Sequence, residues 1–156
     1  QEAMTGARIY KVRNYLNNEP FMLTYGDGLS DINLDSLLAF HRSKNLAVTV
    51  TGVRPPARFG ELQVGSDGIA TGFNEKPQAS AGMISGGFFV CEPTVFTHMN
   101  SQENLVFEQE PMQSLVGEKL LSVYQHAGFW QCMDTFRDWQ LLNSMIDQEK
   151  APWKVW

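Results

Sequence analysis

Apolar residues along this chain fall into short runs that have either strand spacing or helix spacing. Residues 21–25 (FMLTY) form a continuous run of strand length, typical of a strand buried on both faces of a parallel sheet. In residues 30–44, Asn33 is a candidate N-cap, and the leucines after it recur at helical spacing. Residues 46–53 (LAVTVTGV) have the pattern of a second, β-branched strand. Strand, helix and strand make one βαβ unit, so the pattern predicts an α/β fold.

The remaining segments carry weaker patterns, and each leads to an expectation. Residues 7–15 (ARIYKVRNY) alternate weakly, which predicts a strand leading into a helix or a loop. Two short runs around a Ser-Asp-Gly turn, 61–64 and 69–73, predict a hairpin. A last helix is expected to begin at Thr135, with Asp138 three residues later as in a capping box. The other expected elements are a strand at 83–93, short helices at 93–99 and 110–118, one or two strands at 120–132, and a buried helix face at Trp139, Leu142 and Ile146.

Composition and charge narrow the class of protein. With 43% hydrophobic and 19% charged residues, the 156 residues are typical of a single globular domain, which we expect to span 1–156. A net charge of −5 argues against a nucleic-acid or membrane partner, and no apolar run has transmembrane length. The two cysteines, Cys91 and Cys132, lack CxxC spacing, so we expect buried thiols in a reducing, cytoplasmic compartment.

Two aspartates stand where apolar runs end. Asp27 follows FMLTY and lies between Gly26 and Gly28, which leave space for a ligand near the backbone. Asp134 ends the run FWQCM at 129–133. Ligands of open α/β sheets bind beyond the carboxyl ends of the strands, and carboxylates at that place suit Mg²⁺. Taken singly, Asp27 fits an Asp-Gly turn and Asp134 a helix N-terminus, but the two together favour a metal site.

A hairpin end and a glycine pair offer further candidate ligand contacts. Glu75 and Lys76 follow the hairpin, and they supply an acceptor for hydroxyls and a point charge for a phosphate. The alternative for these two residues is a solvated surface pair. Ser85, Gly86 and Gly87 interrupt a strand, and because glycines weaken strands, we expect some group to approach that backbone closely.

Several of these segments together resemble one enzyme family, the glucose-1-phosphate cytidylyltransferases of the nucleotidyltransferase superfamily. The resemblance extends over essentially the whole chain, in order. It implies an incomplete Rossmann-like α/β nucleotidyltransferase fold, in which helices flank a mixed, mostly parallel sheet and a β-hairpin is inserted. The segments that carry it are TGAR (5–8), TYGDG (24–28), RPPARFG (54–60), FNEKP (73–77), GGFFV (86–90), GFWQCMDT (128–135) and KAPWKVW (150–156).

The resemblance also implies a reaction and a set of site residues. In that family, a phosphate oxygen of glucose 1-phosphate attacks the α-phosphorus of CTP, and pyrophosphate leaves. Asp27 and Asp134 correspond to the Mg²⁺ ligands, and Asp27 and Lys76 to residues that act in catalysis. The other implied ligand contacts are Thr5, Arg8 and Gly26 near the nucleotide, and Glu75, Lys76 and Ser85 near the sugar phosphate.

Some positions depart from the family pattern. Ser85 stands where the family has an Asn that reaches a sugar hydroxyl, which leaves sugar selectivity open. Phe107 replaces a Trp, Gln109 an Arg, Cys132 a Pro and Ala7 a Gly. None of these changes removes an implied metal ligand.

The chain has no match to the family's N-terminal GG-x-GTR loop, which wraps the triphosphate. We therefore expect the isolated chain to be inactive or nearly so, and one edge of the FMLTYG strand to be open. Sheets seldom leave such an edge exposed, so we expect a homo-oligomer through this edge or docking on a separate N-terminal half. The alternatives are a related transferase that uses another base, and a non-catalytic, self-associating remnant with weak binding of Mg²⁺ and sugar phosphate.

Overall fold

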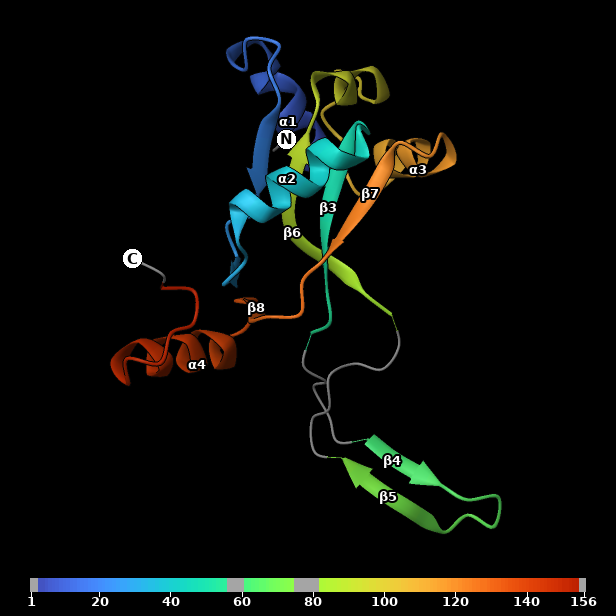
Figure 1. The fold of residues 1–156 in the computed structure, drawn as a ribbon, viewed down its shortest axis with the longest axis vertical. Helices are drawn as coiled ribbons and strands as arrows, with labels where there is room; N and C mark the ends of the chain where they lie inside the picture. The colour runs from blue at the N-terminus through green and yellow to red at the C-terminus, as the bar shows by residue number, and fades with distance from the viewer. Residues whose placement is uncertain (1–2, 56–60, 75–81, 155–156) are drawn as a thin grey trace.

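A four-stranded β-sheet forms the centre of the molecule (Figure 1). The computed structural model describes residues 3–55, 61–74 and 82–154. Three strands predicted from apolar runs, near 21–25, 46–53 and 83–93, are confirmed. The strands lie in the order β1-β6-β3-β7, with bounds Phe21–Thr24 for β1, Ile84–Cys91 for β6, Val48–Val53 for β3 and Leu121–Gln125 for β7.

The pairing of these strands makes the sheet mixed. β6 runs antiparallel to both β1 and β3, whereas β3 and β7 are parallel, with Val48 opposite Leu121. β1 and β3 therefore point the same way, as a βαβ unit requires, but β6 lies between them. The expected mixed α/β architecture is confirmed, and the described sheet is less parallel than expected because β6 inserts at its centre.

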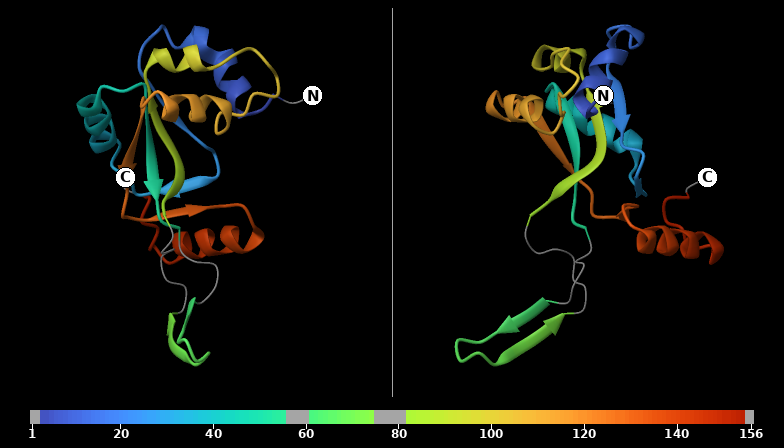
Figure 2. Two further views of the ribbon diagram at one scale, coloured as in Figure 1. Left: turned by 90° about the vertical axis from the view of Figure 1, so that its right-hand side faces the viewer. Right: turned by 180° about the vertical axis from the view of Figure 1, so that it is seen from behind.

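Helices cover both faces of this sheet (Figure 2). α2 (Leu34–Lys44) lies on one face, while α1 (Thr5–Val12), the 3₁₀ turn η2 (Pro93–His98) and α3 (Glu110–Gly117) lie on the other. α2 begins as expected, because the Asn33 side chain accepts a hydrogen bond of 2.8 Å from the Ser36 amide. Among the described residues, no helix has both the length and the apolar character needed to cross a membrane.

The main core lies between the sheet and the α1–α3 face. Alternate residues of each strand point to this side, so Val48 and Val50 of β3 join Phe89 and Cys91 of β6. Aromatic rings hold the centre, with Phe89 in an edge-to-face contact with Phe107 at 5.6 Å between centroids. The other buried members are Ala7, Ile9, Ala47, Val95, Met99, Leu105 and Leu115.

The α2 face of the sheet contains a buried polar network instead. His41 of α2 is 2% exposed, and its Nδ1 lies 2.8 Å from Thr49 Oγ1. Thr49 Oγ1 in turn lies 2.7 Å from Ser122 Oγ, and His41 Nε2 lies 3.2 Å from the carboxylate of Glu92. These bonds satisfy polar groups that burial would otherwise destabilise, and they connect α2 to β3, β7 and the end of β6.

The segment 7–15 is helical, so its prediction as a strand was wrong. α1 covers Thr5–Val12, and a 3₁₀ turn, η1 (Arg13–Tyr15), follows. The helix packs so closely on the chain at Leu105 that a Cβ on Gly6 would lie 2.8 Å from Leu105 Cγ. A weak alternation of apolar and polar residues is compatible with the period of a strand and with that of a helix. Tertiary contacts with the segment before α3 favour the helix.

β1 is an edge strand, and the expectation that both of its faces are buried was wrong. Its residues alternate between half-buried and exposed, and Met22 is 44% exposed. It is hydrogen-bonded to β6 on one side, and no other described strand pairs with it. A continuous apolar run therefore does not imply full burial here, because only one neighbouring strand and one packed face are present among the described residues.

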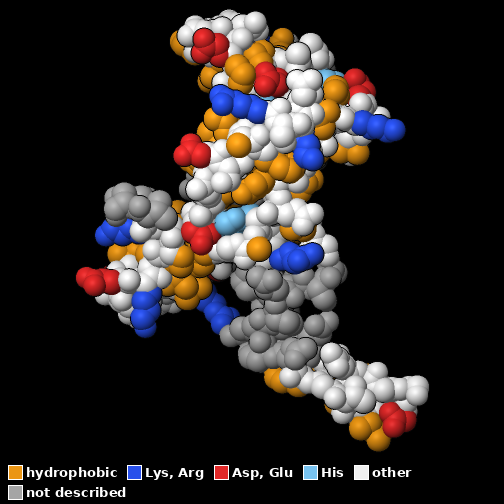
Figure 3. Space-filling model, viewed as in Figure 1, with side chains coloured by type: hydrophobic (Ala, Val, Ile, Leu, Met, Phe, Trp, Pro, Cys, Tyr) orange, Lys and Arg blue, Asp and Glu red, His pale blue; other side chains and the backbone are white. Residues whose placement is uncertain are grey.

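A second, smaller pair of strands lies beyond the ends of the main sheet. β2 (Gly28–Ser30) pairs antiparallel with β8 (Trp130–Cys132), and we call this pair the β2–β8 ribbon. α4 (Phe136–Asp147) follows β8 directly and carries hydrophobic side chains on its surface (Figure 3). Leu142 is buried as expected, but Trp139 and Ile146 are 48% and 50% exposed, so the predicted buried face is wrong at these two positions.

The predicted hairpin is confirmed and lies away from the sheet in Figure 1. β4 (Glu61–Val64) pairs with β5 (Ala70–Asn74), and Leu62 lies opposite Phe73. Both of these side chains are 61% exposed. The turn uses Gly68 with φ +78°, a left-handed conformation that glycine adopts without strain.

Candidate functional site

The β2–β8 ribbon brings the backbones of the two aspartate segments together. Gly28 lies opposite Cys132 in the ladder, and the Met133 amide donates a 2.8 Å hydrogen bond to the Asp27 carbonyl. The residues flanking this bond are therefore neighbours in space although they are far apart in the sequence. The side chains of Asp27 and Asp134 are both exposed.

The donor set at this place suits a hard divalent cation. The Asp27 carboxylate makes no hydrogen bond or ion pair with another described residue, so its oxygens are available to a ligand. Mg²⁺ is commonly held by one or two carboxylates together with water and phosphate oxygens. The described residues contain no cluster of three or more His, Cys, Asp or Glu side chains placed to hold a metal. A shared ion between Asp27 and Asp134 stays a prediction.

Cys132 lies next to these aspartates, and Asp134 affects the pKa of its thiol. Burial, a hydrogen bond to the Asp134 side chain and the nearby negative charges of Asp134 and Asp138 raise the pKa of the Cys132 thiol to about 11. The thiol is therefore protonated at neutral pH and is not a nucleophile there. Cys132 therefore places a neutral thiol beside Asp134.

The glycine pair of β6 lies against side chains of this chain. A Cβ on Gly86 would lie 2.9 Å from Val53 Cγ1 and 3.3 Å from the Thr51 carbonyl oxygen. Gly87 has φ +77°, and a Cβ there would lie 3.2 Å from Tyr25 Cδ2. The close approach expected from the sequence is made by neighbouring strands, which explains both glycines without a bound ligand.

The other residues of the glycine and hairpin segments are placed only in part. Ser85 is exposed, and its hydroxyl accepts a hydrogen bond of 3.3 Å from the Gly87 amide. Glu75 and Lys76 lie outside the described residues, so their positions relative to the aspartates stay predictions.

Thr5 connects α1 to the chain around Glu108. Its hydroxyl donates a 2.8 Å hydrogen bond to the Glu108 carboxylate and accepts a 3.0 Å bond from the Phe107 amide. The hydroxyl of Tyr25 binds the other oxygen of Glu108, so this carboxylate joins the start of α1 to the end of β1. Sequence reasoning did not single out Glu108, because a lone exposed Glu in a loop carries no distinguishing pattern.

Arg8 and Gly26 are exposed near these elements. The Arg8 guanidinium donates a 2.7 Å hydrogen bond to the Ala3 carbonyl through Nε. A Cβ on Gly26 would meet no atom within 4 Å, so the space beside the Tyr25–Asp27 turn is open. This open space agrees with a ligand beside Gly26, which stays a prediction.

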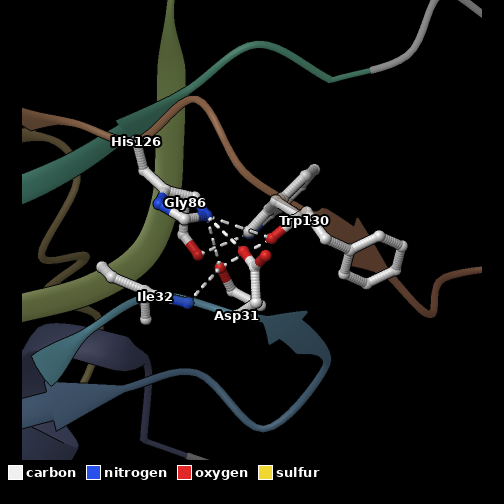
Figure 4. Close-up of polar contacts among 7 residues, drawn as sticks. Asp31, Ile32, Gly86, His126 and Trp130 are labelled. Atoms are coloured by element: carbon white, nitrogen blue, oxygen red, sulfur yellow. Dashed lines mark hydrogen bonds and ion pairs between the residues drawn. The ribbon is translucent and has the colours of Figure 1, made fainter. Parts of the chain in front are cut away.

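A partly buried polar cluster, which the sequence did not indicate, supports the other end of the ribbon (Figure 4). His126 is 11% exposed, and its Nε2 lies 2.9 Å from Asp31 Oδ1 and 3.2 Å from Ser30 Oγ. The Ser30 hydroxyl donates a 2.8 Å hydrogen bond to the Phe129 carbonyl. The Asp31 carboxylate occupies the space in which a side chain at Gly128 would stand. The polar Ser-Asp pair at the end of β2 was the available signal, but the partner is remote in sequence.

Trp130 connects the ribbon to the main sheet. Its indole N–H donates a 2.8 Å hydrogen bond to the Gly86 carbonyl, as Figure 4 shows. Three segments therefore meet here: 28–30, 84–87 and 130–132. These segments include or adjoin most of the described positions that the sequence singled out.

Comparison with known proteins identifies the family. Residues 4–144 match the family model described as nucleotidyl transferase. The chain is 43% identical over 155 residues to the probable glucose-1-phosphate cytidylyltransferase of Bacillus subtilis, and 39% identical to the glucose-1-phosphate cytidylyltransferase of Salmonella typhimurium. In both comparisons 99% of this chain is matched, but it spans only 60% of the relative's length.

Solved structures with the same fold are more distant in sequence. The crystal structure of HddC from Yersinia pseudotuberculosis superposes with a TM-score of 0.68 at 16% identity, over 94% of this chain and 64% of that one. The inositol-1-phosphate CTP transferase of T. maritima gives a TM-score of 0.64 at 16% identity, over 99% of this chain and 64% of that one. These likenesses bear on the fold alone. The match of most of the chain to the family model shows that this chain belongs to the nucleotidyl transferase family.

Proposed function

We propose that this chain takes part in nucleotidyl transfer from CTP to glucose 1-phosphate, which forms CDP-glucose and pyrophosphate. A phosphate oxygen of glucose 1-phosphate forms a bond to the α-phosphorus of CTP, and the bond from that phosphorus to the pyrophosphate oxygen breaks. The observation that carries this proposal is the similarity of 99% of the chain to two glucose-1-phosphate cytidylyltransferases at 43% and 39% identity.

In this proposal Asp27 and Asp134 hold one Mg²⁺ ion at the end of the β2–β8 ribbon. The fit rests on two exposed carboxylates on neighbouring backbone segments, tied by the Met133–Asp27 hydrogen bond. A bound Mg²⁺ would neutralise phosphate charge, which is the main requirement of phosphoryl transfer.

The remaining site residues are assigned to substrate contacts. Lys76 supplies a positive charge for the sugar phosphate, and Glu75 accepts from sugar hydroxyls. Ser85 lies exposed at the start of β6 and offers a shorter hydroxyl contact. Thr5, Arg8 and Gly26 line the nucleotide side in this proposal. Thr5 is joined through Glu108 to Tyr25, the residue before Gly26, which places α1 near the TYGDG segment.

We also propose that the free edge of β1 is covered in the functional assembly. β1 pairs with β6 on one side, and no second described strand pairs with β1 on the other. A second copy of the chain or a separate N-terminal half would complete the hydrogen-bonding of the edge. Gel filtration at low concentration tests this, because a stable, monodisperse monomer would contradict it.

A pyrophosphate-release assay with CTP, glucose 1-phosphate and Mg²⁺ tests the proposed reaction. The chain should be assayed by itself and after mixing with the part of the Bacillus subtilis relative that lies outside the matched region. Because this chain spans 60% of that relative, we expect little or no turnover by the chain itself and CDP-glucose formation in the mixture. Asp27→Asn and Asp134→Asn variants should abolish turnover in the mixture.

The possible outcomes of this assay distinguish the proposed reaction from its alternatives. Ordinary turnover by the chain itself would contradict the expected inactivity but not the proposed reaction. Turnover with another nucleoside triphosphate would assign a different base. If no triphosphate gives product, while Mg²⁺ or glucose 1-phosphate still binds in calorimetry, the chain is a non-catalytic binding remnant.

A further inference from the structure

We propose that the Trp130 indole N–H is a positioning group, which fixes the β2–β8 ribbon against β6 and thereby sets the geometry of the two candidate metal ligands. This inference rests on the proposed function for its link to metal binding. The claim that Trp130 fixes the ribbon against β6 rests only on contacts within the described residues.

The Trp130 indole binds the backbone of β6 beside β2. Trp130 is partly buried, and its Nε1 donates to the Gly86 carbonyl at 2.8 Å. A Cβ on Gly28 would lie 3.5 Å from that carbonyl oxygen and 3.6 Å from the indole nitrogen. The hydrogen bond of Trp130 thus lies against the backbone of β2, next to Asp27.

Few other hydrogen bonds connect the ribbon to the sheet among the described residues. The His126 amide donates a 2.9 Å hydrogen bond to the Gly52 carbonyl, and the Tyr25 amide donates a 3.0 Å bond to the Gly87 carbonyl. Both of these bonds hold the chain where it enters the ribbon. Among the described residues, Trp130 makes the one side-chain hydrogen bond from a ribbon strand to β6.

The two candidate metal ligands flank the ribbon strands. Asp27 directly precedes β2, and Asp134 lies two residues after β8. A small rotation of the ribbon about its two entry points would move both carboxylates together relative to Ser85 on β6. The hydrogen bond from Trp130, at the first residue of β8, to the Gly86 carbonyl resists this rotation, and it also fixes the distance between the proposed metal site and the proposed sugar contact.

The glycine at 86 fits the same role. A Cβ on Gly86 would lie 2.9 Å from Val53 Cγ1 and 3.4 Å from Trp130 Nε1. A Cβ on Gly86 would therefore push β6 away from β3, whereas a Cβ on Gly28 would make only ordinary contacts near the indole. The lack of a side chain at Gly86 keeps the accepting strand in the position that the indole meets.

The test uses Trp130→Phe, which keeps an aromatic ring but removes the N–H donor. Trp139→Phe is the matched control, because Trp139 is 48% exposed on α4 and stacks on Phe136. Hydrogen–deuterium exchange should become about fivefold faster in peptides covering 27–32 and 130–134 of Trp130→Phe, the size expected for one lost hydrogen bond. Exchange in the peptide 48–53 should not change, and Trp139→Phe should match the wild type in all three peptides.

A second measurement distinguishes positioning of the site from local order alone. Mn²⁺ binding, followed by the electron paramagnetic resonance signal of the free ion, should be about fivefold weaker in Trp130→Phe and unchanged in Trp139→Phe. Unchanged exchange in the ribbon peptides would overturn the inference. Faster exchange with unchanged Mn²⁺ affinity would overturn the link to the metal site. Absence of Mn²⁺ binding by the wild type would instead contradict the proposed function, and the exchange measurement would still decide the role of Trp130.

Discussion

The four-stranded sheet and the β2–β8 ribbon are held in place by different interactions. Every residue of β3 is buried, and Phe89 of β6 is 1% exposed. All six ribbon residues are only partly buried, and directional hydrogen bonds such as Trp130–Gly86 and Met133–Asp27 fix them. Residues that must admit a ligand are drawn from the less buried part of a protein, where local stability is lower. The sheet therefore acts as the scaffold, and the ribbon carries the candidate site.

The largest expected effect of a single change lies in the sheet. Phe89→Ala should lower the free energy of unfolding by about 3–5 kcal/mol, because it empties a buried ring position between Tyr25 and Phe107. Urea denaturation measures this loss. Trp139→Ala on α4, where the ring is 48% exposed, should cost clearly less. Equal losses in the two variants would contradict the view that burial of side chains in the sheet stabilises the scaffold.

A change at the junction should affect both regions. Gly86→Ala introduces a Cβ 2.9 Å from Val53 Cγ1 and 3.3 Å from the Thr51 carbonyl oxygen, and we expect a loss of about 1–3 kcal/mol of stability. Thermal unfolding monitored by circular dichroism measures it. Gly117→Ala is the control, since a Cβ there meets no atom within 4 Å, and it should leave stability unchanged or slightly raised. Unchanged thermal stability of Gly86→Ala would show that β6 and β3 separate easily at this point.

A smaller effect is expected at the helix that follows the ribbon. The Thr135 side chain accepts from the Asp138 amide, and the Asp138 carboxylate accepts from the Thr135 amide, which completes the expected capping box. Thr135→Ala should cost about 1 kcal/mol and loosen the first turn of α4. Hydrogen exchange should therefore increase at 136–140 but not in β3. Faster exchange in β3 as well would mean that α4 and the sheet unfold as one unit.

The last prediction concerns the pH dependence of the sheet. Burial first, and then the charge of Glu92, raise the pKa of the Cys91 thiol from 9.0 to about 12. Above pH 9 the unfolded thiol loses its proton while the folded one keeps it, so stability falls as the pH rises. The loss attributable to Cys91 should be about 1 kcal/mol between pH 9 and pH 10. Cys91→Ala should remove this part of the slope in urea titrations, and an unchanged slope would contradict the prediction.

Local patterns were sufficient for much of the scaffold. β-branched and apolar runs predicted β3 and β6, an N-cap with helical spacing predicted α2, and a Ser-Asp-Gly turn predicted the hairpin. These elements depend on contacts within a few residues, which the sequence displays directly. The prediction failed at α1, whose helical form depends on packing against Leu105, and at β1, whose burial depends on how many strands flank it.

The candidate site, too, could be predicted from the sequence only in part. Two aspartates at the ends of apolar runs could be recognised singly, and the order of motifs along the chain indicated their family. The contacts that support them could not be predicted, because His126 with Asp31 and Trp130 with Gly86 join segments remote in sequence. The presence of a single Trp or His in a sequence does not indicate which residue its side chain contacts.

The sequence by itself was enough to assign most of the regular elements and the chemical types of the candidate ligands, because each of these depends on a few neighbouring positions. It also indicated the family, through a resemblance of seven segments that occur in order along the chain. Three features came from the folded chain instead: β6 separates β1 from β3, the glycine pair accommodates neighbouring strands, and an indole N–H anchors the ribbon. They depend on distances between remote segments, which are set when the strands pair and the side chains pack around them.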